Sequence, residues 1–150
     1  MVDLAPLAKQ LADGIVDALP RWVERSVDRV YRQAYATPPP PDVADAARRA
    51  GKAAAHAIGP ALRDLLGRDI DEQTSTPLTV VRGAVRYPTS VLRAANVPEL
   101  VRDARDQVMF AEDVYGLTPA NFADIDPGLA DAGIAWGAAK AWTHRRRHQP

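Results

Sequence analysis

The sequence predicts an all-α fold, and three of its features support this. In the first segment, apolar residues recur at steps of three and four, the spacing of one helix face: Leu4, Leu7, Leu11, Ile15 and Leu19. Later prolines stand where they would open short helices at their first turn. Alanine is abundant and aromatics make up only 6% of the chain, which favours close helix approach. We expect one compact domain over residues 1–150, a bundle of about six or seven helices, several of them short and proline-initiated.

The N-terminal segment is expected to form two helices. Asp3 is a suitable N-cap for the first. Pro20 then predicts a break or kink, because proline disfavours helix in the preceding residue. The second helix would run from Pro20 to about Tyr35 and has a clear apolar stripe: Trp22, Val23, Val27, Val30, Tyr31 and Ala34.

A proline-rich segment separates these helices from the next one. Residues 37–41 contain four consecutive prolines, which cannot donate backbone hydrogen bonds and favour an extended linker. Asp42 can cap the following helix, which has a face of mostly small residues suited to a closely packed neighbour: Ala44, Ala47, Gly51, Ala54, Ala55 and Ile58. The Gly59–Pro60 pair predicts a second break or kink, and Gly67 the end of this helix.

The second half of the chain is expected to hold shorter elements. Pro77, Pro88 and Pro98 would each open a short helix, although the β-branched residues 79–81 leave a short strand open. Residues 110–128 are expected to be irregular, with one helical turn after Pro119. A last helix is expected from about Leu129 to Arg146, with a basic flexible tail at 143–150. Within that helix, Gly133, Gly137 and Ala141 share a side, and we expect Gly137 to lie at a close helix contact.

Composition limits the chemistry that the protein can perform. The chain has no cysteine, which excludes thiol catalysis, thiolate zinc sites and iron–sulfur ligation. Lys and Arg equal Asp and Glu at 19 each, so net charge gives no nucleic-acid signature. The first residues lack a signal-peptide pattern, and no apolar run is long enough to span a bilayer. We therefore expect a cytoplasmic protein.

No catalytic, metal or cofactor signature is present, and none of these sites is predicted. His56 is interpreted as a partly buried packing residue rather than a base, and His144 with His148 as part of a frayed end. The acidic residues of 69–72 and 124–126 are interpreted as solvated loops or helix caps rather than cation ligands. Enzymatic function is therefore the less favoured expectation.

Charge is segregated along the chain. Residues 74–98 contain Arg82, Arg86 and Arg93 but no acid, whereas 99–131 carry eight acids against two arginines. On one helix the three arginines would form a strip, given their spacing of four and seven residues. The strip has two open explanations: it recognises phosphate or a carboxylate-rich partner, or it pairs with the acidic segment of the same chain.

Aromatic residues suggest where a partner surface lies. Trp22 and Trp136 are expected to anchor the core, whereas Trp142, beside the basic end, is the best candidate for exposure. The residues predicted to bind a partner are Arg82, Arg86, Arg93, Trp142, Arg145, Arg146 and Arg147. The leading expectation is a non-enzymatic interaction or regulatory protein with a protein partner. Nucleic-acid binding through these arginines is one alternative. A small-molecule-binding or enzymatic bundle using carboxylates and tyrosines such as Tyr87 and Tyr115 is another.

Overall fold

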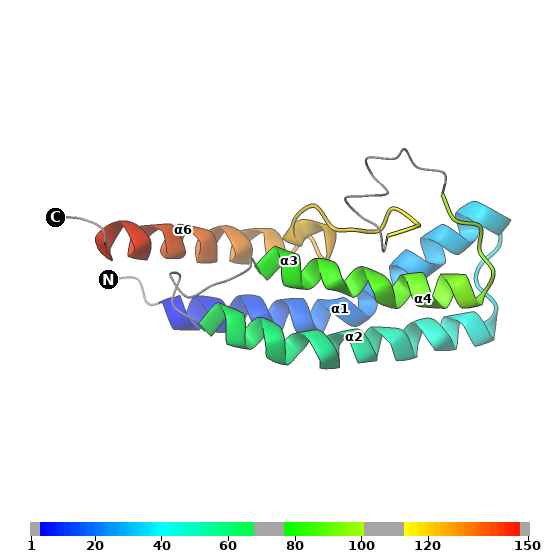
Figure 1. The fold of residues 1–150 in the computed structure, drawn as a ribbon, viewed down its shortest axis with the longest axis horizontal. Helices are drawn as coiled ribbons and strands as arrows, with labels where there is room; N and C mark the ends of the chain where they lie inside the picture. Colours follow the sequence, from blue (N-terminus) through cyan, green and yellow to red (C-terminus); the bar gives the residue numbers. More distant parts are fainter. Residues whose placement is uncertain (1–3, 68–76, 101–112, 148–150) are drawn as a thin grey trace.

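The described residues of the computed structural model form four helical rods (Figure 1). The model describes residues 4–67, 77–100 and 113–147. The rods are α1 (Leu4–Tyr35), α2 (Pro41–Gly67), the consecutive α3 (Pro77–Arg82), η2 (Gly83–Val85) and α4 (Arg86–Ala94), and finally α6 (Leu129–Arg147). They alternate in direction, so the start of α1 and the end of α6 lie at the same end of the bundle. The all-α prediction is confirmed, whereas the count of six or seven helices is not.

The predicted break at Pro20 is a bend inside one helix. Helix α1 runs unbroken from Leu4 to Tyr35, and its second half turns away from the line of the first (Figure 1). Proline lacks an N–H, so the carbonyl four residues earlier loses its helical donor and the helix bends. Burial on both sides of the proline stabilises the continuous helix, because Leu19 and Val23 are completely buried. Pro60 likewise lies inside α2.

Helices α1 and α2 cross in close contact at Gly51, and the predicted small-residue face is confirmed there. A Cβ atom added to Gly51 would lie 2.8 Å from the Cα of Pro20 and 2.9 Å from its carbonyl oxygen. A real side chain cannot occupy that space, so glycine is required for this approach of the two backbones. The crossing therefore sits at the bend of α1.

The core has two parts, one toward each end of the bundle. The first is formed by α1, α2, α3 and α6, and includes Leu11, Leu62 and Trp136. The second lies around α4 and includes Val27, Leu92 and Tyr115. Trp22 and Trp136 are 5% and 6% exposed, which confirms that both are core residues.

The prolines of the second half behave differently from one another. Pro77 opens α3 as predicted, and residues 79–81 are helical, so the strand alternative is wrong. Pro88 is the third residue of α4, within the first turn, where the missing N–H has no intrahelical acceptor to lose. The chain is not helical at residues 98–100, and most of the helix expected after Pro98 lies outside the described residues.

The chain before α6 is irregular, as predicted, apart from the short 3-10 helix η3 (Phe122–Asp124). The start of α6 at Leu129 is confirmed. The predicted close contact at Gly137 is wrong, because no atom of the described residues lies within 4 Å of a Cβ added there. At Gly133, by contrast, an added Cβ would lie only 2.8 Å from Cδ2 of the Phe122 ring. Helix α6 continues to Arg147, so the described part of the predicted tail, residues 143–147, is helical.

Candidate functional site

The three arginines of the predicted strip have different surroundings. Arg82 is half-buried, and its Nε and Nη2 donate to the carbonyl oxygens of Pro119 and Ala120 at 3.0 and 3.5 Å. Arg93 donates from Nε to Glu99 Oε1 at 2.9 Å. Arg93 therefore pairs with an acid of the 99–131 segment, as the internal explanation of the strip predicts, whereas Arg82 binds backbone carbonyls of that segment and no acid among the described residues.

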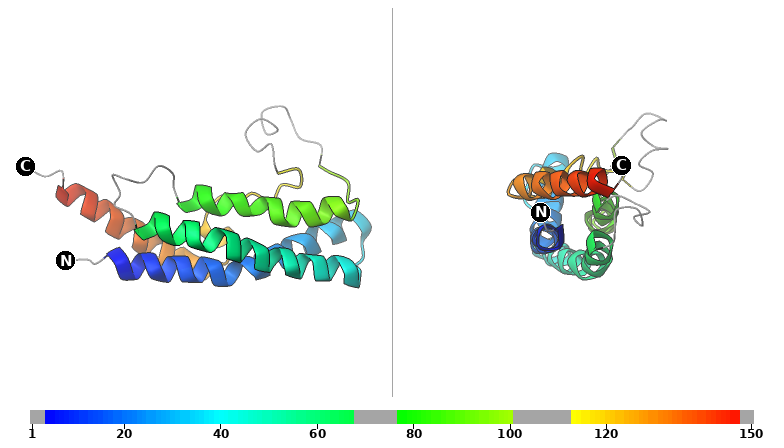
Figure 2. Two further views of the ribbon diagram at one scale, coloured as in Figure 1. Left: turned by 60° about the horizontal axis from the view of Figure 1, so that its bottom comes forward. Right: turned by 90° about the vertical axis from the view of Figure 1, so that its left-hand side faces the viewer.

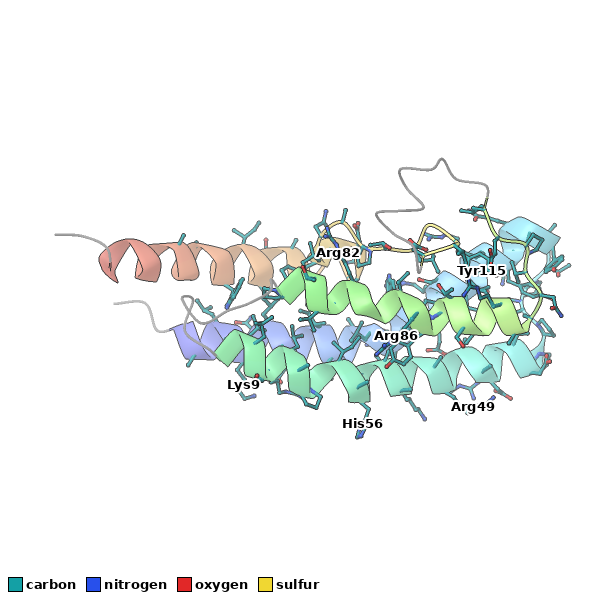
Figure 3. All side chains as sticks on the ribbon, viewed as in Figure 1. Lys9, Arg49, His56, Arg82, Arg86 and Tyr115 are labelled. Atoms are coloured by element: carbon teal, nitrogen blue, oxygen red, sulfur yellow. The ribbon has the colours of Figure 1, made fainter. Side chains whose placement is uncertain are left out.

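Arg86 differs from its two neighbours because it is exposed and forms no ion pair with a described residue. Its guanidinium carbon lies 5.3 Å from the centre of the Tyr87 ring, a cation–π distance. In Figure 3, Arg86 lies on the side of α4 nearest α2. The side chains of Trp142, Arg145, Arg146 and Arg147, the other predicted partner-binding residues, lie outside the description, although their backbone belongs to α6.

Replacing Arg82 by alanine is expected to lower the free energy of unfolding by about 1–2 kcal/mol, because it removes charged hydrogen bonds from the carbonyls of Pro119 and Ala120, the first of which is part-buried. Arg86→Ala should change it by less than about 0.5 kcal/mol, since exposed side chains without a strong partner contribute little. Urea unfolding of both variants checks this. Equal stabilities would contradict the structural role assigned to Arg82.

The acidic residues of the segment before α6 hold the loop in place. Asp124 Oδ2 accepts hydrogen bonds from the amides of Ala120 and Asn121 at 2.7 and 3.2 Å, and the side chain of Asn121 caps Asp124 in return. Asp126 accepts from the amide of Gly128 at 2.8 Å, which, with Arg21, lowers its pKa. The interpretation of 124–126 as caps is confirmed, and the described residues contain no cluster of three or more metal ligands.

Asp113 accepts four hydrogen bonds from described residues, and the sequence analysis did not identify it. It is 3% exposed. Its carboxylate accepts hydrogen bonds from the amides of Tyr115, Leu117 and Thr118 and from the Thr118 hydroxyl, the closest at 2.7 Å. An aspartate ahead of Gly116, which has φ +71°, is a pattern typical of a side chain that caps its own turn. That pattern could have identified Asp113 as the residue that holds this turn in place.

The two tyrosines considered for chemistry are packed into the fold. Tyr115 is buried, and its hydroxyl donates to the carbonyl oxygen of Val97 at 2.7 Å. Burial raises the pKa of Tyr115, so its proton stays in place at neutral pH. Tyr87 is half-buried beneath Arg86. These positions favour structural roles for both residues.

The outer face of α2 carries a second set of basic side chains, which we call the basic row: Arg49, Lys52 and His56. Their spacing of three and four residues places them on one face. All three are exposed and form no ion pair with a described residue, and Figure 3 shows Arg49 and His56 projecting away from the bundle. The interpretation of His56 as a partly buried residue is therefore wrong.

The basic row is set apart from nearby charge pairs on the same helix. Arg48 pairs with Asp45 at 2.9 Å, and Arg63 reaches Asp13 of α1 at 3.3 Å. Between Asp45 and Asp64 the sequence contains no acid. The sequence shows this acid-free stretch, but the exposure of the row and its lack of ion pairs to described residues come from the structure.

A hollow of about 700 Å³ opens between the second half of α1 and the start of α2. Trp22, Val27 and Ala47 lie at its floor, and charged residues of α1 stand at its rim. Pro38 and Pro39 of the linker close one end. The α1 lining of the hollow begins at Trp22, just after Pro20, beside the close crossing with α2 at Gly51.

Comparisons with protein-family models, curated proteins and solved structures found no match to this chain. In the described part of the chain, no helix is long and apolar enough to cross a membrane. The fold and its surfaces therefore carry the functional argument.

Proposed function

We propose that the protein is a non-enzymatic interaction protein that docks on an acidic surface of a protein partner through the basic row of α2. The observation that carries the proposal is the exposure of Arg49, Lys52 and His56 on one face without ion pairs to described residues. Unpaired cations in a row attract a complementary acidic surface, which mainly speeds association and fixes orientation.

Among the described residues, the small number of basic side chains without ion pairs favours a protein partner over nucleic acid. Proteins that depend on phosphate contacts commonly neutralise six to ten phosphates. The basic row offers three side chains, one of them a histidine, and the chain as a whole has no net charge. Three basic side chains are enough to contact a short acidic surface. The absence of cysteine suits a reducing compartment, and we place the interaction in the cytoplasm.

Affinity capture from the native cell, with the full chain as bait, tests the proposal. The Arg49→Gln/Lys52→Gln variant removes two charges from the row, and Arg29→Gln/Arg32→Gln removes the same charge from α1. Quantitative mass spectrometry should find a protein that the wild type and the α1 variant retain and the α2 variant loses. Equal capture by all three baits would refute docking through the row, and capture of nucleic acid alone would favour the rival class.

The hollow supports a second candidate function, the binding of a small molecule. Its volume lies in the usual range of ligand sites, and its apolar floor with a polar rim is typical of them. Native mass spectrometry of the protein purified from its own cell would show a bound molecule as added mass. That mass should disappear in Ala44→Phe, because Ala44 lines the hollow and a larger side chain would fill it.

A further inference from the structure

Helix α6 is apolar on two opposite faces, and the bundle covers only one of them. Leu129 and Trp136 point inward and are buried. On the opposite face Ile134 is 70% exposed, and Ala138 and Ala141 are exposed as well. An apolar face left exposed on a helix commonly marks a contact surface. The outer face of α6 therefore lacks a partner within the described chain.

The outer face has the spacing of a coiled-coil seam with a charge at each end. We call these positions the α6 seam, and they follow one another at steps of three, four, three and four: Asp131, Ile134, Ala138, Ala141 and Arg145. This is the heptad spacing of helices that pack along one another. Arg145 belongs to the seam by its register in the helix. At 1.5 Å per residue the seam is about 21 Å long.

The geometry points to a second copy of this chain as the occupant, with two α6 helices packed antiparallel about a two-fold axis at Ala138. In that arrangement Asp131 of each copy faces Arg145 of the other, because both lie seven residues from the axis. A parallel pair would instead place like charges together at both ends. Both copies would therefore contribute the same residues to the contact, which is the condition for a two-fold symmetric interface.

Small residues at the centre of the seam allow the two helices to approach closely. In the proposed dimer, Ala138 lies on the axis and Ala141 lies next to Ile134 of the second copy. Gly137 lies beside the seam. Nothing in the described chain lies within 4 Å of a Cβ added to Gly137. Glycine inside a helix costs about 1 kcal/mol relative to alanine, and contact with another backbone would account for it. In the left view of Figure 2, the C-terminal end of α6 extends past the start of α1.

The α6 seam would bury less surface area than the interface of an obligate dimer does. Stable interfaces bury more than about 1,000 Å² in total, and one pair of short helices with alanines at its centre reaches little beyond that. The dimer should therefore form reversibly and depend on protein concentration.

Sedimentation velocity of the full chain from about 1 μM to about 1 mM tests the dimer, since weak interfaces associate in this range. The mass of the wild type should rise from 16.2 kDa toward twice that value. Asp131→Arg and Arg145→Asp should each remain monomeric, because each sets like charges together at both ends. The double variant restores opposite charges and should dimerise again.

Two further variants separate the seam from general effects on folding. Ala138→Glu places two carboxylates on the axis and should also give a monomer, whereas Ala53→Glu on the exposed face of α2 should dimerise like the wild type. Circular dichroism should show the same helicity throughout. A wild type that stays monomeric at every concentration, or a double variant that does not recover, would overturn the proposal.

Discussion

Replacing Asp113 by alanine is expected to lower the free energy of unfolding by about 3–5 kcal/mol, the largest effect of any single substitution considered. The carboxylate accepts four hydrogen bonds at a position that is 3% exposed. Alanine would leave the amides of Leu117 and Tyr115 without an acceptor inside the protein, and each buried unsatisfied group costs about 1–3 kcal/mol. The loop that carries Tyr115 and Leu117 into the core would lose its anchor.

Urea unfolding measures this loss, and Asp45→Ala, at an exposed position of α2, is the control. Asp113→Asn should fall between the wild type and Asp113→Ala, because an amide keeps one acceptor but has no charge. If Asp113→Ala were as stable as Asp45→Ala, the anchor would have no energetic role.

The same carboxylate predicts a loss of stability in acid. Burial raises the pKa of Asp113, but hydrogen bonds from Leu117, Thr118 and Tyr115 together outweigh burial, so the pKa lies below its ordinary value. A lowered pKa gives stabilisation that is complete above the ordinary aspartate pKa of about 3.9 and is lost as the pH falls through the folded-state value. Urea midpoints of the wild type should therefore fall below about pH 4 more steeply than those of Asp113→Asn.

Replacing Gly51 by leucine is expected to cost about 3 kcal/mol, the upper end of the range for overpacking. The added Cβ alone would lie 2.8 Å from the Cα of Pro20. Because the obstructing atoms belong to a helix backbone, they cannot rotate away as a flexible side chain would. Helices α1 and α2 would have to separate at the crossing that fixes the bend.

Gly83→Ala is the matched control, since no atom of the described residues lies within 4 Å of a Cβ at Gly83. It should be neutral or stabilise by up to about 1 kcal/mol, because alanine loses less backbone entropy on folding. Urea unfolding of both variants compares them directly. Similar effects at Gly51 and Gly83 would show that the crossing is looser than the structure indicates.

The helical class and the approximate ends of the long helices could be predicted because they depend on local spacing. The unbroken helix through Pro20 could not, because its stability depends on burial against α2 and on Gly51, 31 positions away in the sequence. The choice between Gly133 and Gly137 failed for a similar reason. Both glycines share a side of α6, and only the position of Phe122 distinguishes them.

The candidate site was only partly accessible from sequence. Counting charges identified Arg82, Arg86 and Arg93. Arg82, however, binds the carbonyl groups of residues 119 and 120, and a charge count does not include backbone carbonyls. The basic row of α2 was not predicted because its basic residues stand among alanines, a pattern that is also typical of an ordinary solvent-exposed helix face. Its distinction is the lack of ion pairs, which only the structure reveals.

The dependence of the association rate on salt tests the central claim, docking of the basic row on an acidic protein, most directly. With the captured partner immobilised, the wild type should bind more slowly as ionic strength rises, because salt screens exposed charges over about 10 Å at 0.1 M. Arg49→Gln/Lys52→Gln should bind several-fold more slowly at low salt and depend less on salt, while Arg29→Gln/Arg32→Gln should match the wild type. Rates that are equal for all three proteins at every salt concentration would contradict the account.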